Sequence, residues 1–218
     1  MRCMRSGLPE EMHHGNGIMK NFNILIVGVG GQGVILASDT LAEIGMENGF
    51  DVKKSDSIGM SQRGGSVVSH IRWGERVYSP MIKKGEVDYL VGLEKLEAVR
   101  SASYLKPGGT ALIADIAIPP VSLISSTMKY PDDNEINGTF SRIRVNHHVI
   151  PVDRICAEAG NMKALNMVML GALSCFMGLD ESIWVNDIRK RLKPEFIDSS
   201  LRAFSLGALE IRNAAGND

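Results

Sequence analysis

Cysteine is scarce in this chain of 218 residues, and Cys3, Cys156 and Cys175 lie far apart without forming a C-x-x-C pair. Iron–sulfur clusters and structural zinc sites are usually held by closely spaced cysteines, so this pattern argues against either centre within the chain. Few cysteines are also typical of a reducing compartment. We therefore expect a cytoplasmic location, with Cys156 and Cys175 packed in helices as small apolar residues.

The chain also lacks an excess of charge of either sign. It has 24 Lys and Arg against 25 Asp and Glu, which gives a formal net charge of −1. Such a balance provides no long-range attraction to nucleic acid or to an anionic membrane surface. No run of about 18 apolar residues is present, so no segment is predicted to span a bilayer. We expect neither a nucleic-acid partner nor a membrane partner.

Recognisable catalytic motifs are missing as well. The sequence contains no G-x-S-x-G, no familiar Cys–His setting, no clustered carboxylates and no Asp/Asn motif that would hold the magnesium diphosphate of thiamine. His70, His147 and His148 fall in predicted strands without obvious carboxylate partners, and we expect core or surface histidines. The residues by themselves predict a non-catalytic or cooperating domain.

The most informative feature present is the segment Gly28-Val29-Gly30-Gly31-Gln32-Gly33, directly after the apolar run 23–27. A buried strand that ends in spaced glycines and leads into a helix is typical of a turn that cradles a phosphate or a dinucleotide. We assign Gly28 to the tight turn, Gly30 to close approach of a ligand and Gly33 to packing of the helix on the sheet. The start of the helix favours an anion. The predicted cofactor-binding residues here are Gly28, Gly30, Gly31, Gln32 and Gly33.

Two other interpretations of this turn stay open. A nicotinamide dinucleotide needs an acidic residue at the end of the second strand, roughly 20 residues further on, to hold the ribose hydroxyls. Asp56 is a candidate, although it follows Lys53 and Lys54 and not a clean apolar strand. Alternatively, the glycines serve a purely structural turn that holds no ligand.

A second unusual segment, Gly59-Met60-Ser61-Gln62-Arg63-Gly64-Gly65, places two glycines after an arginine. An approachable backbone beside a cation suits an anionic cofactor or a partner subunit. We expect Arg63 to bind the anion, and the residues around it to line the site or contact a partner: Met60, Ser61, Gln62, Gly64 and Gly65. The alternative is a solvated entry into a hairpin.

Three more polar residues fall near expected element boundaries. Glu94 opens a βα loop at the carboxyl edge of the sheet, where ligands bind in open α/β folds, or else it is an acid that stabilises the helix dipole. Asn161 and Asn166 lie at the start of a strongly apolar helix, either as site-lining residues or as caps.

The alternation of strands and helices predicts an α/β fold with an open, mostly parallel sheet, a β-hairpin insert and a helical C-terminal tail. We expect the hairpin at residues 66–80, a further small hairpin within the excursion 115–144, and a buried helix over 164–177 in which Gly171 allows close backbone packing. Residues 1–18 fit no element and are expected to be a disordered leader or an over-long start, followed by a single domain over 19–218.

Several segments together resemble one known family. Besides the two glycine segments, they are Tyr78-Ser79-Pro80, the stretch 160–172 and the tail 203–207. They resemble the gamma-type domain of 2-oxoacid:ferredoxin oxidoreductases. The resemblance covers about residues 20–208 and is greatest to the indolepyruvate ferredoxin oxidoreductases, in which this domain is a separate, short beta subunit.

The resemblance implies a small subunit of a thiamine-dependent, anaerobic enzyme. A larger alpha subunit would carry thiamine diphosphate, magnesium and the iron–sulfur clusters. The complex would oxidise indolepyruvate or another aryl pyruvate with coenzyme A, giving an aryl-acetyl-CoA and reduced ferredoxin. The isolated chain would be inactive and hold no cofactor alone, although contact with coenzyme A is implied. The residues alone leave open a free-standing NAD(P)- or flavin-dependent oxidoreductase and a non-catalytic assembly scaffold.

Overall fold

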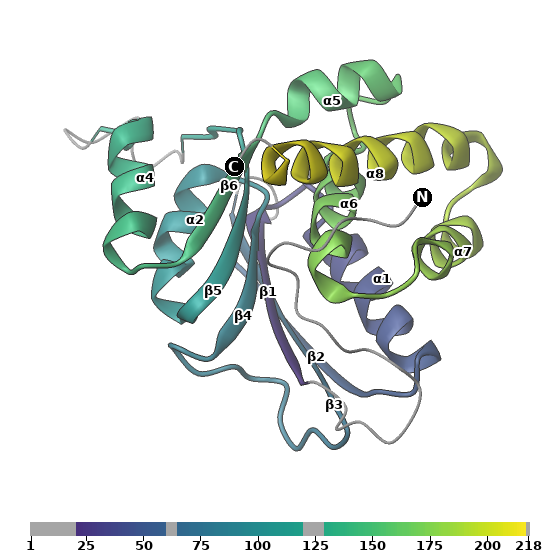
Figure 1. Cartoon of the computed structure of the whole chain (residues 1–218), viewed down its shortest axis with the longest axis horizontal. Helices are drawn as coiled ribbons and strands as arrows, with labels where there is room; N and C mark the ends of the chain where they lie inside the picture. The colour runs from purple at the N-terminus through teal and green to yellow at the C-terminus, as the bar shows by residue number, and fades with distance from the viewer. Residues whose placement is uncertain (1–20, 60–64, 120–128, 217–218) are drawn as a thin grey trace.

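The computed structural model describes residues 21–59, 65–119 and 129–216, which fold around one six-stranded sheet (Figure 1). The strands are β1 (Phe22–Val29), β2 (Asp51–Ile58), β3 (Ser66–Gly74), β4 (Val87–Gly92), β5 (Leu105–Ala114) and β6 (Asn146–Ile150). Their order is β2-β3-β1-β4-β5-β6, and only β3 runs antiparallel to its neighbours. The predicted open, mostly parallel α/β sheet is confirmed. The expected leader at 1–18 lies outside the described residues.

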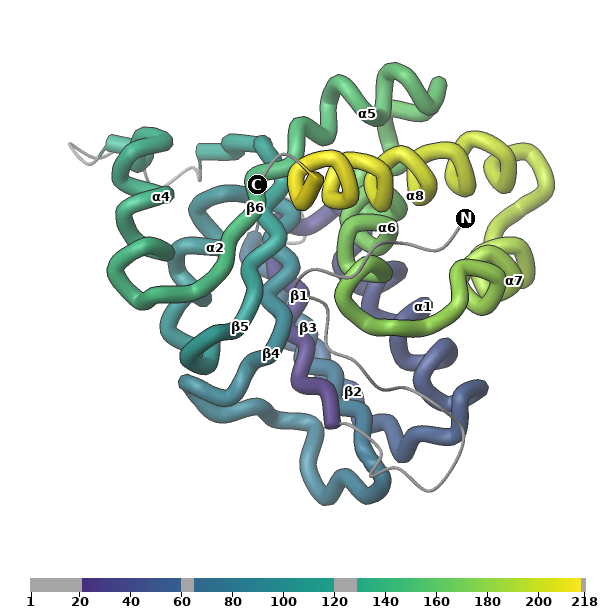
Figure 2. The backbone as a smooth tube through the Cα atoms, viewed as in Figure 1, coloured from purple at the N-terminus to yellow at the C-terminus, as the bar shows by residue number. Residues whose placement is uncertain are grey.

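Helices cover both faces of the sheet (Figure 2). They are α1 (Val34–Glu47), α2 (Lys95–Ser101, followed by a 3-10 turn over Ala102–Tyr104), α4 (Asp133–Arg142), α5 (Val152–Ala159), α6 (Leu165–Met177), α7 (Glu181–Arg191) and α8 (Pro194–Ala215). Successive side chains of β1 point to opposite faces of the sheet, so β1 contributes to two hydrophobic cores. Ile24 and Ile26 pack with α1 and α6, whereas Leu25 and Val27 pack with α2 and α4. The predicted helical C-terminal part is confirmed.

The antiparallel hairpin consists of β2 and β3, so its predicted position at residues 66–80 was wrong. β3 pairs with β1 on one side and with β2 on the other over nearly its whole length, and no edge of β3 remains for residues 76–79. The backbone N–H of Val77 donates instead to a carboxylate oxygen of Asp51, at 2.8 Å. The polar strand β2 takes the position beside β3 that the prediction gave to residues 76–79.

The described part of the excursion, residues 115–119 and 129–144, contains the helix α4 and no strand of the small hairpin expected there, while residues 120–128 lie outside the described residues. Asp132 and Glu135 form a capping box, in which each side chain accepts a hydrogen bond from the backbone N–H of the other, at 2.9 and 3.0 Å. Ile136 and Phe140, four residues apart, are buried in the core shared with α2. The capping signal was present in the sequence and outweighs the turn residues around it.

Helices α6 and α8 cross in direct backbone contact. A Cβ atom added at Gly171 would lie 1.9 Å from the carbonyl oxygen of Phe204, and one added at Gly207 would lie 2.1 Å from that of Val168. The close packing predicted for Gly171 is therefore confirmed, and Gly207 is its counterpart on the facing helix.

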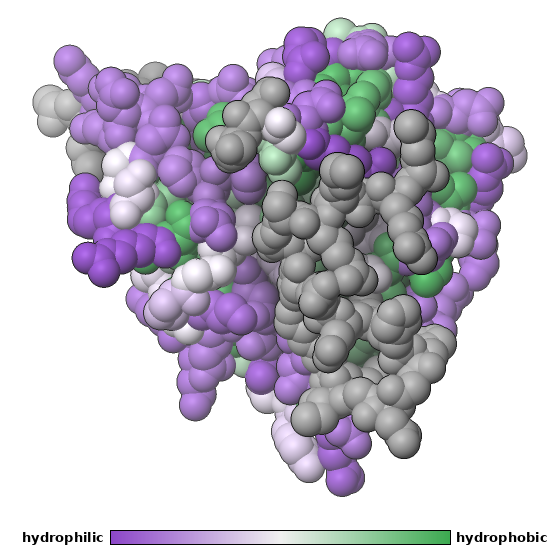
Figure 3. Space-filling view, viewed as in Figure 1, coloured by the Kyte–Doolittle hydropathy of each residue, from purple (hydrophilic) through white to green (hydrophobic). Residues whose placement is uncertain are grey.

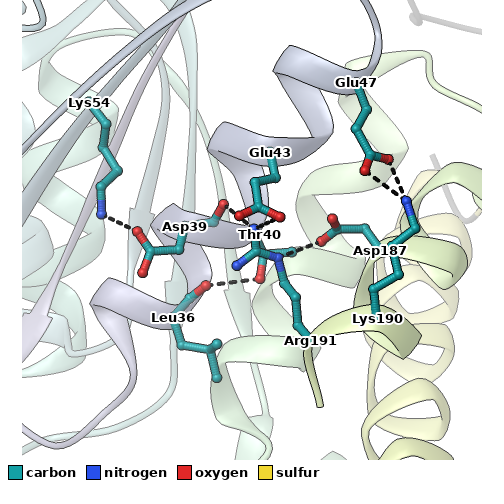
Figure 4. A network of polar contacts seen from close by, with 9 residues as sticks. All are labelled: Leu36, Asp39, Thr40, Glu43, Glu47, Lys54, Asp187, Lys190 and Arg191. Carbon is teal, nitrogen blue, oxygen red and sulfur yellow. Dashed lines mark hydrogen bonds and ion pairs between the residues drawn. The ribbon is translucent and has the colours of Figure 1, made fainter.

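Ion pairs fix α7 against α1 (Figure 4). Arg191 contacts Asp187 at 3.0 Å and also pairs with Glu43, while Lys190 contacts Glu47 at 2.7 Å. Asp187 is fully buried, and this burial raises the pKa of its carboxyl against the opposing effect of Arg191. The helix that follows the glycine turn is thus held along its outer side by charges from α7.

Outside the residues drawn in grey, the face seen in Figure 3 is mostly hydrophilic, with apolar side chains near α5 and α8 and smaller apolar areas elsewhere. Phe196 and Leu209 of α8 keep 49% and 46% exposure. Within the described ranges, none of the helices combines the length and the apolar character that crossing a membrane requires.

His70 is a buried, neutral hydrogen-bond acceptor. The side chain in β3 is only 5% exposed, and its Nδ1 accepts a hydrogen bond from the backbone N–H of Ile82 at 3.3 Å. Burial lowers the pKa of this histidine. Because the unfolded chain takes up the proton first as the pH falls, the stability that His70 contributes is full above about pH 6.5 and is lost below it.

We expect Gly171→Ala and Gly207→Ala each to lower the free energy of unfolding by about 3 kcal/mol or more, because the added methyl meets backbone that cannot move aside. The matched control is Gly138→Ala in α4, where a Cβ meets nothing within 4 Å. There the better helix propensity of alanine should raise stability by up to about 1 kcal/mol. Urea unfolding measures all three, and equal effects at the three positions would contradict the proposed crossing.

We also expect His70→Asn to flatten the pH dependence of unfolding below about pH 6.5, since an amide oxygen can accept the bond from Ile82 without titrating. The measurement is the difference in unfolding free energy between wild type and variant at each pH, from which other titrating groups cancel. Parallel curves over this range would show that His70 has no shifted pKa.

Candidate functional site

The carboxyl edge of the sheet has a point at which two neighbouring parallel strands lead to helices on opposite faces. β1 continues through the glycine turn, residues 28–33, into α1 on the α6 side, whereas β4 continues through Leu93 into α2 on the other side. The backbone N–H of Leu93 donates to the carbonyl of Val27 at 2.8 Å, so the C-terminal ends of β1 and β4 lie side by side. Open α/β sheets bind ligands at such a switch point, which makes it the candidate site.

The glycine turn is confirmed as a tight strand-to-helix connection, but two of its glycines act differently from the prediction. Gly31 and Gly33 adopt positive φ angles of 103° and 82° and make the turn. A Cβ on Gly28 would lie 3.0 Å from Cβ of Leu93, so Gly28 is needed for strand packing. A Cβ on Gly33 would lie 2.6 Å from Nδ2 of Asn166, so Gly33 faces α6 and not the sheet.

The side chain of Gln32 links the C-terminal ends of β1 and β4. Its Oε1 accepts from the backbone N–H of Val29 at 2.7 Å, and its Nε2 donates to the carbonyl of Leu93 at 2.8 Å. Its own backbone N–H donates to the carbonyl of Val29 at 3.1 Å. Both the side chain and the amide of Gln32 are thus engaged within the protein, and its predicted ligand contact stays a prediction.

Several amides at the turn remain available to an anion. Gly30 donates to the carbonyl of Gly65 at 2.9 Å, but among the described residues the N–H groups of Gly31, Gly33 and Val34 have no acceptor. Gly33 is the N-cap of α1 without a side-chain cap, and the first turn of α1 carries no acidic residue. The helix start therefore offers donors and a positive dipole end, and the first turn of α1 carries no negative charge of its own.

The second glycine segment meets the turn through Gly65. Its carbonyl accepts the bond from Gly30, and the stem of the loop is closed by the N–H of Gly59, which donates to the carbonyl of Ser66 at 2.8 Å. The remaining residues of this segment lie outside the described residues, so their predicted contacts stay predictions: Met60, Ser61, Gln62, Arg63 and Gly64.

The two predicted asparagines have different surroundings. Asn166 is 5% exposed and packs against Gly33 at the turn, so it belongs to the site. Asn161 donates to Oγ of Ser199 at 3.2 Å and accepts from the N–H of Lys163 at 3.0 Å, which ties the loop before α6 to α8. Its side chain thus connects the loop to α8 and does not cap α6, whose N-cap is Ala164 without a side-chain hydrogen bond; its predicted place in the site stays a prediction.

Asp56 does not take the place of a dinucleotide-binding acid. That role needs the strand next to β1, but β3 lies between β1 and β2, which carries Asp56. The carboxylate contacts Lys54 at 2.8 Å and accepts from Oγ of Ser69 at 2.5 Å. The strand order therefore removes the argument for a nicotinamide dinucleotide.

Beside β4 lies a cluster of polar residues, of which the sequence analysis identified only Glu94. Glu94, 1% exposed, caps α2 by accepting from the N–H of Glu97 at 2.9 Å, which confirms the helix-start alternative. It also accepts from the N–H of Ile118 at 3.0 Å and from the hydroxyl of Tyr130. Burial, together with the Glu94 carboxylate, raises the pKa of Tyr130. No local pattern links position 94 to position 130.

The described residues contain no group of three His, Cys, Asp or Glu side chains placed to hold a metal ion. Cys156 is buried in α5 and Cys175 is partly buried in α6, where both pack with the apolar core as predicted. Burial raises the pKa of the Cys156 thiol, which disfavours the nucleophilic thiolate.

Sequence comparison places the chain among known oxidoreductases. The model of the family described as pyruvate ferredoxin/flavodoxin oxidoreductase matches residues 23–210. The indolepyruvate oxidoreductase subunit IorB of Thermococcus kodakarensis (strain ATCC BAA-918 / JCM 12380 / KOD1) is 35% identical over 201 residues, which cover 91% of this chain and 100% of that protein.

Two solved structures share the fold. The gamma subunit of a keto/oxoacid ferredoxin oxidoreductase from Geobacter sulfurreducens PCA has a TM-score of 0.65 at 21% identity, and the match covers 87% of this chain and 98% of that one. A 2-oxoglutarate:ferredoxin oxidoreductase from Magnetococcus marinus, with 2-oxoglutarate, coenzyme A and succinyl-CoA bound, has a TM-score of 0.69 at 20% identity. That match covers 89% of this chain and 31% of the other.

We expect Gly33→Ala to lower the unfolding free energy by at least about 2 kcal/mol, because it adds both a positive-φ strain and a collision with Asn166. Gly31→Ala, at similar φ but with nothing within 4 Å of the new methyl, should cost only about 1 kcal/mol. Adding Asn166→Ala should recover part of the Gly33→Ala loss and none of the Gly31→Ala loss. Equal losses from the two glycine variants would refute the contact.

Proposed function

The chain belongs to the pyruvate ferredoxin/flavodoxin oxidoreductase family as the small subunit of a 2-oxoacid:ferredoxin oxidoreductase, and from this premise we propose that its complex acts on indolepyruvate or another aryl pyruvate. The support is the relative named indolepyruvate oxidoreductase subunit IorB, which this chain matches over that protein's full length. The proposed reaction breaks the bond between the carboxylate and the keto carbon and releases carbon dioxide. It transfers the acyl group to the thiol of coenzyme A and passes two electrons to ferredoxin.

We assign the redox and decarboxylation chemistry to a larger subunit that carries thiamine diphosphate, magnesium and iron–sulfur clusters. Only three cysteines occur in the present sequence, fewer than the four thiolates that an ordinary cluster uses. The isolated chain is expected to be inactive and, in the intact enzyme, to work in the cytoplasm.

The role that we propose for this subunit is to bind an anionic group of coenzyme A at the glycine turn. The observation that carries the proposal is the set of available amides of Gly31, Gly33 and Val34 at an uncapped helix start on the switch point. Arg63, four positions from Gly59 and three from Ser66 at the stem of the neighbouring loop, would add the positive charge that a phosphate needs. Met60, Ser61, Gln62 and Gly64 would line the site or contact the larger subunit.

We expect Arg63→Ala and Gly31→Ala, in the complex with the larger subunit, to raise the KM for coenzyme A about 10-fold while changing the KM for the 2-oxoacid little. The first removes a charge-assisted contact, and the second places a methyl group where the anion would approach. Steady-state reduction of ferredoxin with each substrate varied in turn gives both constants, and Arg142→Ala in α4 is the exposed-arginine control.

Size-exclusion chromatography must show that each variant still assembles. An unchanged KM for coenzyme A in an assembled complex would exclude the anion-binding role and favour a scaffold with a purely structural turn. Binding of NADH or a flavin to the isolated chain at micromolar concentration would favour the free-standing oxidoreductase instead.

A further inference from the structure

Two buried carboxylates, Glu94 and Glu97, lie at the start of α2 on the β4 side of the switch point, and the role proposed above does not use them. They are 1% and 6% exposed. Burying a carboxylate is costly unless its oxygens are hydrogen-bonded or paired with a cation. The groups that donate hydrogen bonds to Glu94 and Glu97 therefore show which parts of the molecule these two carboxylates hold together.

Glu94 holds both described ends of the connection that follows β5. One of its oxygens accepts from the N–H of Ile118, at 3.0 Å, and from the hydroxyl of Tyr130. The Tyr130 oxygen in turn accepts from the N–H of Leu96 at 3.1 Å. Positions 118 and 130 are thereby fixed against the first turn of α2, although they are twelve positions apart in the chain.

The next residue, Lys95, reinforces the same arrangement. Its ammonium contacts Asp115 at 2.5 Å and Asp133 at 2.7 Å, one residue on each side of the connection, and its backbone N–H donates to the carbonyl of Ile116 at 3.0 Å. Burial lowers the pKa of Lys95, but the two carboxylates outweigh this effect and raise it overall. Lys95 is therefore charged and holds both sides of the connection.

Glu97 reaches in the opposite direction, toward the glycine turn. One oxygen accepts from Oγ of Ser66 at 2.6 Å and the other from Arg100 at 2.6 Å. Ser66 directly follows Gly65, whose carbonyl accepts the N–H of Gly30 at 2.9 Å. Because the N–H of Glu97 donates to Glu94 at 2.9 Å, one line of contacts runs from Tyr130 to the turn.

We propose that Glu94 and Glu97 are positioning residues that couple Ile118 and Tyr130 to the glycine turn. Both residues belong to the described parts of the connection between β5 and α4, and the two carboxylates link them to the loop that contacts Gly30. A change at Tyr130 then alters the geometry at Gly30. The expectation that it also alters the use of coenzyme A rests on the function proposed above; the coupling itself does not.

The coupling is tested by amide hydrogen exchange in the full chain, resolved by NMR. Tyr130→Phe removes the hydroxyl and should speed exchange at the remote Gly30 amide by at least about 3-fold, as well as at Ile118 and Leu96. The matched control is Tyr104→Phe, since the Tyr104 hydroxyl makes no hydrogen bond within the described part of the chain. Faster exchange at Ile118 and Leu96 with an unchanged Gly30 would overturn the proposal.

The functional consequence is tested in the assembled complex. Tyr130→Phe and Ser66→Ala should each raise the KM for coenzyme A by about 3-fold or more with little change in kcat, and the double variant should be no worse than the more severe single variant, because both act through the same carboxylates. Unchanged KM values in variants whose Gly30 exchange has increased would reduce Glu94 and Glu97 to a structural role. If the wild-type complex does not use coenzyme A at all, the proposed function fails while the exchange experiment still decides the coupling.

Discussion

The contact between the ends of β1 and β4 determines the geometry of the carboxyl edge. The bond from the N–H of Leu93 to the carbonyl of Val27, together with the two bonds of the Gln32 side chain, keeps the strand exits together. α1 and α2 then depart to opposite faces of the sheet, which is the switch point at which open α/β sheets bind ligands. The amides of the turn follow β1 and the buried carboxylates of α2 follow β4, so the groups proposed to bind and to position come from separate strands.

Much of this arrangement follows from local sequence, and the rest depends on pairing over long distances. The strand, glycine turn and helix over residues 22–47 are encoded by apolar spacing and by glycine, and each formed where predicted. The insertion of β3 between β1 and β2 has no local signature, because it depends on which polar strand pairs with its free edge. For the same reason the position of Asp56, the contact of Gly33 with Asn166 and the bond of Tyr130 to Glu94 are visible only in three dimensions.

Helix α1 is restrained at both of its ends, which matters for a helix whose first turn offers donors to an anion. Gly33 abuts Asn166 of α6 at the beginning, while Glu43 and Glu47 pair with Arg191 and Lys190 of α7 further along (Figure 4). α6 in turn is fixed to α8 through Gly171. These contacts fix the direction of the backbone N–H groups at the start of α1 without a ligand, so a bound anion would cost little further conformational entropy.

The outer strand of the sheet, β2, affects whether free copies of the chain aggregate. Among the described residues, β2 pairs on one side only, and such a free edge can recruit a strand from another molecule. This edge strand carries four charged residues, Asp51, Lys53, Lys54 and Asp56, of which Lys53 and Asp56 are exposed. Charged side chains on an outer strand oppose its pairing with a strand of another molecule, so edge-to-edge aggregation of free copies is disfavoured.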